Sequence, residues 1–187
     1  MMQALKEWAV VCRALEQGRQ VVLLRKGGIL EYRQGFEVKH DKFLIFPTFE
    51  HQSKDHLQPG FAGGLEQVMK DQPPAGRARL SCYAEAKEVR EVNDLGLLKK
   101  LEKFHVWNES YVKARMDYNP TKPMSVILLR AFKLDNPIDI QARHEWAGCK
   151  SWVPVGVGDD SSSSPVMSDI DFENVVREFR KVLSIAA

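Results

Sequence analysis

The stretch from Val21 to Gln52 contains two short apolar runs, Val21-Val22-Leu23-Leu24 and Phe43-Leu44-Ile45-Phe46, and polar residues follow each run at once. After the first come Arg25-Lys26-Gly27-Gly28, and after the second come Pro47-Thr48-Phe49-Glu50-His51-Gln52. Short apolar runs bounded by turn residues are typical of buried strands. Because a strand holds the turn that follows it in place, polar groups on such turns often bind ligands. The two strand ends are therefore the first candidate site.

Turn length and residue alternation predict a mainly antiparallel sheet. The predicted strands Val21–Arg25, Phe36–Val38 and Phe43–Phe46 are separated by turns too short for a crossover helix, so we expect antiparallel pairing. Leu80 to Val92 alternates apolar and polar residues with one bulge, as a strand with one buried face does. Met124 to Leu134 is apolar on both faces apart from two cations, which is typical of a central strand.

Helical spacing accounts for most of the other apolar residues. Residues from Leu5 to Leu15 keep a helical period that Gly18 would end, although alternate residues from Trp8 to Cys12 also fit a strand; helix is the favoured interpretation. The other expected features are a short helix at Leu65–Met69, a helix from Leu97 to His105 behind an Asn93-Asp94 cap, a helix at Glu109–Met116, a turn at Asp135-Asn136-Pro137 and a further strand between Ile138 and Val155.

The chain is expected to form one α+β domain over residues 1–155. Residues 156–167, rich in Gly, Ser and Asp, cannot bury enough apolar surface to order themselves and are expected to be a flexible linker. Residues 168–187 then form an amphipathic helix, with Ser168 and Asp171 as its capping box. The polar, Gly- and Pro-rich segment 52–76 is the expected insertion or lid.

Composition places the 187 residues among ordinary globular proteins, with 44% hydrophobic and 28% charged residues. Apolar runs such as Val126 to Leu129 are far too short for a membrane span, and the N-terminus lacks the pattern of a secretion signal, so we expect a cytoplasmic protein. Three scattered cysteines, Cys12, Cys82 and Cys149, suggest free thiols and no zinc site. Neither a metal nor a cofactor is expected.

The net charge of +2 is unevenly distributed. Residues 1–150 hold 24 Lys and Arg against 19 Asp and Glu, whereas residues 151–187 hold 3 against 6. A basic body can attract phosphates, but this excess is mild beside that of dedicated nucleic-acid binders. The charge therefore permits a nucleic-acid partner without demanding one.

Four blocks of sequence carry a family resemblance: Leu24-Arg25-Lys26-Gly27-Gly28-Ile29, Phe43-Leu44-Ile45-Phe46-Pro47-Thr48 with His51-Gln52, Leu128-Leu129-Arg130, and Gly148-Cys149-Lys150-Ser151-Trp152. In this order they resemble the bacterial family catalogued as domain of unknown function 1802, over roughly Leu5 to Val155. The resemblance leaves out the serine-rich linker and the terminal helix, and the family has no established activity. Some members look fused to an Mrr-type restriction nuclease domain, which implies a restriction or DNA-defence setting by association only. No such domain fits in this chain, so that role would need a separate partner.

The alternating strand from Leu80, the helix at Leu97 and the strand ending near Pro137 also resemble, more loosely, the element order of PUA-like barrels that bind RNA or modified bases. This is a likeness of order and not of motif. The expected fold class is α+β, with a mainly antiparallel sheet, open or barrel-like, and flanking helices.

The turn Arg25-Lys26-Gly27-Gly28 has the chemistry of an anion site. Glycines let backbone N–H groups approach a phosphate, while Arg offers a fork of donors and Lys a point charge. A hairpin turn with solvated cations is an equally good interpretation, because Gly-Gly is itself a strong turn signal.

Further candidates surround the second strand and the later blocks. His40 and His51 could act as acid, base or ligand, although a hydrogen-bonding role is favoured, with Thr48 and Gln52 fixing the turn after Pro47. Arg130 interrupts an apolar strand, so it needs a ligand anion or, as we slightly favour, a structural acid such as Glu31 or Glu85. The remaining candidates are Lys150, Ser151 and Trp152; with Trp107 and Tyr111, Trp152 could stack on bases or simply fill the core.

A binding module is favoured over an enzyme. The first hypothesis is a nucleic-acid or nucleotide-phosphate site built from the Arg25 turn, the Thr48 to Gln52 turn and Arg130. A rival is a Mg²⁺-dependent nuclease that uses Asp71, Glu85 and Lys87, because Glu-x-Lys on a strand with an upstream acid is typical of restriction-type nucleases. A third is a scaffold that meets a protein partner through the C-terminal helix.

Overall fold

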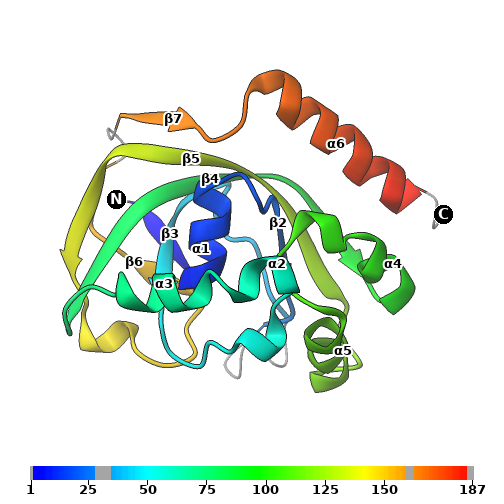
Figure 1. Cartoon of the computed structure of the whole chain (residues 1–187), viewed down its shortest axis with the longest axis horizontal. Helices are drawn as coiled ribbons and strands as arrows, with labels where there is room; N and C mark the ends of the chain where they lie inside the picture. Colours follow the sequence, from blue (N-terminus) through cyan, green and yellow to red (C-terminus); the bar gives the residue numbers. More distant parts are fainter. Residues whose placement is uncertain (1, 28–34, 159–161, 185–187) are drawn as a thin grey trace.

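The computed structural model describes residues 2–27, 35–158 and 162–184, and its strands form one curved, mixed sheet (Figure 1). The strand order is β2-β5-β4-β3-β1-β6, with β7 pairing beside β5. Among the strands of the described residues, β1 and β3 pair in parallel and the other pairs are antiparallel. The strands are β1 (Gln3–Trp8), β2 (Val22–Arg25), β3 (Lys42–Thr48), β4 (Arg77–Val92), β5 (Met124–Gln141), β6 (Trp152–Pro154) and β7 (Ser163–Pro165).

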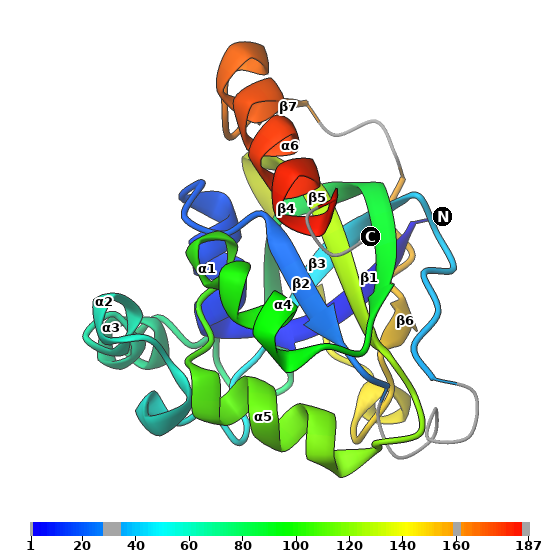
Figure 2. The same cartoon turned by 90° about the vertical axis from the view of Figure 1, so that its right-hand side faces the viewer.

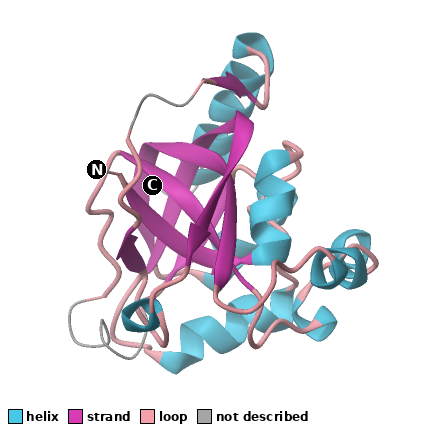
Figure 3. Cartoon of the chain, turned by 90° about the vertical axis from the view of Figure 1, so that its left-hand side faces the viewer, coloured by secondary structure: helices cyan, strands magenta, loops and turns pink. Residues whose placement is uncertain are grey.

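Helices cover the sheet unevenly. Figure 2 and Figure 3 show α6 at one end of the sheet and α5 at the other, with α2 and α3 set to one side. The α-helices are α1 (Ala9–Glu16), α2 (Pro59–Ala62), α3 (Leu65–Lys70), α4 (Leu95–Lys100), α5 (Glu109–Tyr118) and α6 (Asp169–Ser184); 3-10 turns lie at Lys54–His56, Glu102–Phe104 and His144–Trp146. The expected α+β fold with a mainly antiparallel sheet and flanking helices is confirmed. The sheet is open, since β2 and β6 at its ends do not pair in the described part of the chain.

The long β4–β5 hairpin forms the middle of the sheet. Its register runs from Arg77 opposite Gln141 to Val92 opposite Met124, with irregularities between Leu80 and Cys82 and between Ala86 and Glu88. Bulges of this kind bend a strand and increase its twist. The alternation and bulge predicted for β4 are therefore present, and they curve the sheet around its larger core.

Side chains of the sheet alternate between two hydrophobic clusters. On β3, Phe43 and Ile45 join the large cluster under the helices, whereas Leu44 and Phe46 join a smaller cluster on the other face. Because successive side chains of a strand point to opposite faces of the sheet, a strand whose residues are all apolar contributes to a core on each face. Cys12 and Cys82 are buried free thiols, and Cys149 is an exposed one.

The N-terminal segment corrects the first helix prediction. Residues Gln3–Trp8 form β1, and the helix begins only at Ala9. These residues form a strand despite their helical spacing because β1 makes backbone hydrogen bonds on both sides, with β3 in parallel and with β6 antiparallel. Gly18 ends the region as predicted, with a positive φ of 66°.

Several predicted connections are also wrong. β2 and β3 do not pair with each other: β2 pairs with β5 and β3 lies between β4 and β1. Residues 36–38 are irregular. Asp135-Asn136-Pro137 lies inside β5, at the irregularity opposite Leu80–Cys82, and β4 pairs with β5 on both sides of it. Within 156–167, expected to be a linker, β7 pairs with β5, while residues 159–161 lie outside the described residues.

The terminal helix α6 packs on the body of the protein. Phe172 and Phe179 are 6% and 0% exposed, and the ring of Phe179 meets that of Phe104 edge-on at 6.1 Å. Ser168 caps the helix by accepting a hydrogen bond from Asp171 N–H at 3.1 Å, as predicted. Lys103 pairs with Glu178 at 2.6 Å across the interface. The apolar stripe of α6 is therefore occupied within this chain, and contact with a protein partner through α6 stays a prediction.

Replacing Phe179 by Ala should lower the free energy of unfolding by about 3–5 kcal/mol, because it leaves a cavity between α6 and the core. Urea unfolding followed by circular dichroism measures this loss. Ile170→Ala on the same helix, where the side chain is 73% exposed, should change stability by less than about 0.5 kcal/mol. Equal effects of the two substitutions would mean that α6 does not dock as described.

Burial of His105 should make stability depend on pH. Its ring is 2% exposed, and desolvation lowers its pKa from 6.5 to about 4. Between these two pH values the histidine is protonated in the unfolded chain and neutral in the folded one. The contribution of His105 to the free energy of unfolding is therefore fully present above pH 6.5 and falls by about 3 kcal/mol towards pH 4. Urea titrations across this range should show a smaller slope for His105→Phe. Val106→Ala, which also disturbs the core but keeps the histidine, should retain the wild-type slope.

Candidate functional site

A cavity of about 370 Å³ lies at the carboxyl ends of β1, β2 and β3. We call it the strand-end cavity. The parallel pairing of β1 with β3 brings their last residues together, and α5 and the loop before β6 complete the wall. The lining residues are Lys6, Glu7, Trp8, Leu24, Arg25, Gly27, Thr48, Glu50, His51, Trp107, Tyr111, Arg115, Gly148, Cys149, Lys150 and Ser151.

The strand-end cavity brings together six of the residues predicted from sequence. They come from the turn after β2, the turn after β3 and the loop before β6, which are far apart along the chain: Arg25, Gly27, Thr48, His51, Lys150 and Ser151. Gly28 lies outside the described residues. The other five candidates, Lys26, His40, Gln52, Arg130 and Trp152, do not line this cavity.

Arg130 is held at another part of the sheet. Its guanidinium pairs with Asp169 at the start of α6 and lies over the ring of Phe172, 5.1 Å from the ring centre. The expectation that Arg130 joins the anion site is therefore wrong. A structural acid does hold it, but that acid is Asp169 and not Glu85, while Glu31 lies outside the described residues.

Lys26 and Gln52 bond to groups outside the lining of the cavity. Lys26 is 1% exposed and its Nζ lies 3.4 Å from Met116 Sδ, and burial lowers the pKa of the ammonium. Gln52 Oε1 accepts a hydrogen bond from Val10 N–H at 3.0 Å, at the start of α1. Gln52 therefore fixes the backbone at the start of α1, whereas Lys26 contacts a side chain of α5.

His40 and Trp152 belong to an aromatic cluster beside the cavity. Trp152 Nε1 donates to the carbonyl of Glu37 at 3.2 Å, and its ring lies roughly parallel to Phe36 at 6.1 Å. His40 meets the same indole edge-on at 5.2 Å. This cluster touches the site through Phe36, whose ring lies 4.8 Å from the Arg25 guanidinium.

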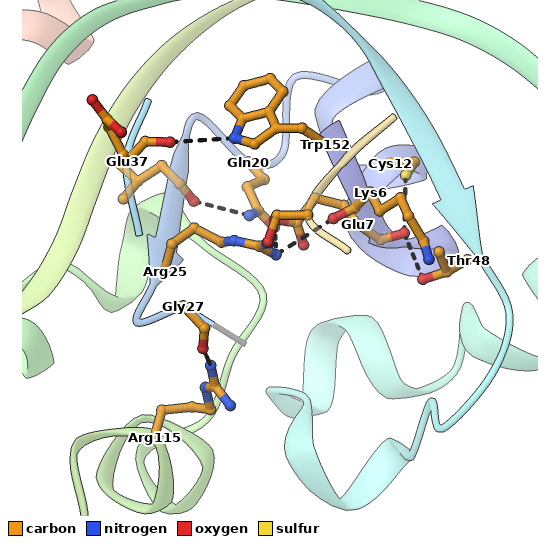
Figure 4. Close-up of polar contacts among 12 residues, drawn as sticks. Lys6, Glu7, Cys12, Gln20, Arg25, Gly27, Glu37, Thr48, Arg115 and Trp152 are labelled. Atoms are coloured by element: carbon orange, nitrogen blue, oxygen red, sulfur yellow. Dashed lines mark hydrogen bonds and ion pairs between the residues drawn. The ribbon is translucent and has the colours of Figure 1, made fainter. Parts of the chain in front are cut away.

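Arg25 forms the central polar contact of the cavity (Figure 4). Its Nη1 donates to Glu7 Oε1 at 2.9 Å, and its Nη2 donates to Ser151 Oγ at 2.7 Å. Glu7 is only 6% exposed; burial raises the pKa of its carboxyl, and the neighbouring Arg25 opposes that rise. The guanidinium thus joins β2, β1 and the loop before β6 at one point.

Three further cationic side chains, Lys6, Arg115 and Lys150, line the cavity. Lys6 Nζ donates to the carbonyls of Trp146 and Gly148, both at 2.8 Å, and burial is the main cause that lowers its pKa. Arg115 Nη2 donates to the Gly27 carbonyl at 3.0 Å, as Figure 4 shows. Lys150 Nζ donates to the carbonyl of Glu145 at 2.7 Å. A carbonyl fixes a cation but does not neutralise it, so these contacts leave positive charge at the wall.

One wall of the cavity is aromatic. Trp107 and Tyr111 are stacked, with ring centres 4.1 Å apart at 20°, and Trp8 meets Trp107 edge-on at 5.0 Å. Trp107 is almost completely buried, while Trp8 and Tyr111 are partly exposed, and burial raises the pKa of the Tyr111 hydroxyl. The lining of the cavity therefore combines flat apolar surface with a set of cations.

The turn after β3 is tied to β1 and strained. Thr48 Oγ1 donates to the carbonyl of Glu7 at 3.0 Å. His51 has a positive φ of 61°, a conformation that side chains other than glycine rarely adopt. Such strain persists only where the surroundings impose it, and it is common at functional sites.

Sequence reasoning missed Lys6, Glu7 and Trp8, because it read this segment as a helix. The alternation seen from Trp8 to Cys12 falls in α1, and Gln3–Trp8 itself does not alternate apolar and polar residues, so the strand had no local signal. Arg115 stands on α5 and has no local signal that sets it apart from other surface cations.

The residues of the nuclease hypothesis are paired with different partners. Asp71 Oδ2 accepts from Arg13 at 2.7 Å, and Glu85 pairs with Lys87 on its own strand at 2.6 Å. Among residues 2–27, 35–158 and 162–184, no three His, Cys, Asp or Glu side chains gather in a group that could hold a metal ion. The structure therefore gives the nuclease hypothesis no support.

The fold and cavity describe an α+β protein with a cationic and aromatic pocket at its strand ends. The chain belongs to the family described as Domain of unknown function (DUF1802), whose sequence profile matches residues 4–178. The match continues past Val155, through the predicted linker and most of α6, which the resemblance seen in the sequence had left out. This extent agrees with the packing of α6 on the core.

Two solved structures have a limited likeness to the chain. They are crystal structures of ASCH from Zymomonas mobilis and of a mutant of it, with 14% and 13% identity and a TM-score of 0.42 for both. Each comparison covers 76% of this chain, and 88% and 89% of those chains respectively. No curated protein matches the sequence. Within the described ranges, no helix is both long and apolar enough to cross a membrane.

Replacing Arg25 by Met should lower the free energy of unfolding by about 3 kcal/mol at pH 7, because it leaves the Glu7 carboxylate buried without its cation. The loss should shrink as the pH falls, since the raised pKa of Glu7 lets the carboxyl protonate in the folded state. Adding Glu7→Gln should recover most of the stability. A double-mutant cycle by urea unfolding measures the coupling, and additive losses would contradict the pairing.

Proposed function

We propose that the strand-end cavity binds a nucleotide of a nucleic-acid strand, and that the protein is a binding module and not an enzyme. The observation that carries the proposal is the combination of four cations and an aromatic wall in one cavity. A nucleotide has matching parts, an anionic phosphate and a flat base. The volume of about 370 Å³ falls in the range of small-molecule sites.

The cations supply the phosphate side of the proposed site. Arg115 and Lys150 donate to carbonyl oxygens, and each has further N–H donors for a phosphate. Arg25 has fewer donors available to a ligand, since its two terminal nitrogens already donate to Glu7 and Ser151. The carboxylates at the wall are Glu7, already paired with Arg25, and the exposed Glu50. The balance of charge therefore favours an anionic ligand.

The aromatic wall supplies the base side. A base that stacks on an aromatic side chain gains about 1–3 kcal/mol, whatever its sequence. Trp8 and Tyr111 have exposed surface for such a contact, and the buried ring of Trp107 holds them in place. The restriction-associated setting that the family resemblance implies makes DNA the first probe, with RNA as the second.

The double substitution Arg115→Ala with Lys150→Ala should weaken binding of a fluorescein-labelled single-stranded oligonucleotide about 10-fold at low salt, since it removes two phosphate donors. Fluorescence anisotropy with DNA and RNA probes measures this. The slope of log affinity against log salt should also become shallower by about one unit, as expected when one to two phosphate contacts are lost.

The matched control is Arg177→Ala with Lys181→Ala on α6, which removes the same charge at the other end of the sheet (Figure 1). Its affinity should stay within about 2-fold of the wild type. Equal weakening by both double variants would reduce the binding to general electrostatic attraction. Failure of the wild-type protein to bind any probe would reject the proposed function.

A further inference from the structure

A second cavity of about 230 Å³ lies directly beside the strand-end cavity. We call it the proline-rim cavity, because Pro73 and Pro74 of the segment 72–76 form part of its edge. The two cavities share four lining residues: Lys6, Thr48, Glu50 and Gly148. Since the same four residues border both, the two cavities adjoin along this edge of the sheet, and we call the pair the groove.

The junction between the cavities is firmly built. Lys6 Nζ lies there, held by two carbonyls of the loop 146–148 at 2.8 Å each. Thr48 is tied to β1 through the carbonyl of Glu7. Gly148 has a φ of 77°, and among the described residues other than its two chain neighbours no heavy atom lies within 4 Å of the place where a Cβ would stand. A fixed cation beside open space suits a ligand chain that passes from one cavity to the other.

The proline-rim cavity repeats the chemistry of its neighbour. Arg77 and Arg143 are exposed cations at its wall, and Glu50 is the carboxylate among its lining residues; Arg143 also pairs with the exposed Glu145 at 3.4 Å. Phe46 and Trp146 meet edge-on at 5.9 Å but are only 8% and 5% exposed, so they support the wall and offer little free surface. The flat surface of this cavity comes from the partly exposed Phe49 and from Pro73 and Pro74. Cations beside aromatic and proline faces again match phosphates beside bases.

We infer that the groove binds a single-stranded nucleic acid of two or more nucleotides, with successive nucleotides in the strand-end cavity and the proline-rim cavity. The inference rests on the proposed function and adds the class of ligand. A duplex is disfavoured because its bases are already stacked and cannot reach aromatic walls inside cavities. A neutral or basic peptide is disfavoured because the residues that line the two cavities include six cations and two carboxylates.

The test is a length series of fluorescein-labelled oligothymidylates, from one to eight nucleotides, measured by anisotropy at low salt. The affinity of the wild type should rise about 10-fold between one and four nucleotides and then level off. Arg77→Ala with Arg143→Ala should remove most of this gain and leave mononucleotide affinity within about 2-fold. Arg115→Ala with Lys150→Ala should weaken every length. Both arginines are exposed, so the folded state should persist in circular dichroism.

The outcomes separate the two proposals. Mononucleotide affinity equal to that of the tetranucleotide, or a length gain that survives in Arg77→Ala with Arg143→Ala, would overturn the inference and leave the proposed function standing. No binding at any length by the wild type would reject both. Stronger competition by a matched duplex, or by a hexaglutamate peptide, than by the unlabelled octanucleotide would also overturn the inference, in favour of a duplex or an acidic partner.

Discussion

The parallel pairing of β1 with β3 is the constraint on which the rest of the site depends. It places Trp8 opposite Thr48, so that two strands end at the same edge of the sheet. In an antiparallel pair the two ends would lie at opposite edges. The short helix α1 follows β1 at once and covers the sheet, with Val10 N–H capped by Gln52 from the turn after β3. The pairing of β1 with β3 thus positions both the strand-end cavity and the helix α1 that packs on the core.

Within that frame, the pair of Arg25 and Glu7 locks the strand ends together. The two charges are largely removed from water, and this desolvation costs free energy. The 2.9 Å hydrogen bond to Glu7 and the second hydrogen bond to Ser151 offset that cost. The other cations of the cavity are held by carbonyl oxygens and keep their charge. The site therefore separates a structural cation from cations that are available to a ligand.

Much of the fold was predictable where local pattern and tertiary environment agree. The strands around Leu23 and Ile45, the bulged strand from Leu80, and the capped helices were predicted, since their apolar periods match the faces they bury. The prediction failed where pairing overrides local preference. Residues 3–8 became a strand because they gained two neighbours, and Pro137 sits inside β5 because the long pairing with β4 continues past it. Such long-range partners have no signature in a short window of sequence.

The sequence by itself determined the chemistry of the site: a cation and glycine turn after one strand, a Thr and His turn after another, and the block from Gly148 to Trp152. It also determined an α+β protein whose basic body can attract anions. Only the tertiary structure decided which of these groups meet. In the fold, Arg25, Thr48 and Lys150 line one cavity with Lys6 and Arg115, whereas Arg130 lies elsewhere and pairs with Asp169. The physical reason is that composition sets what a side chain can bind, whereas strand order and register set which side chains share a surface.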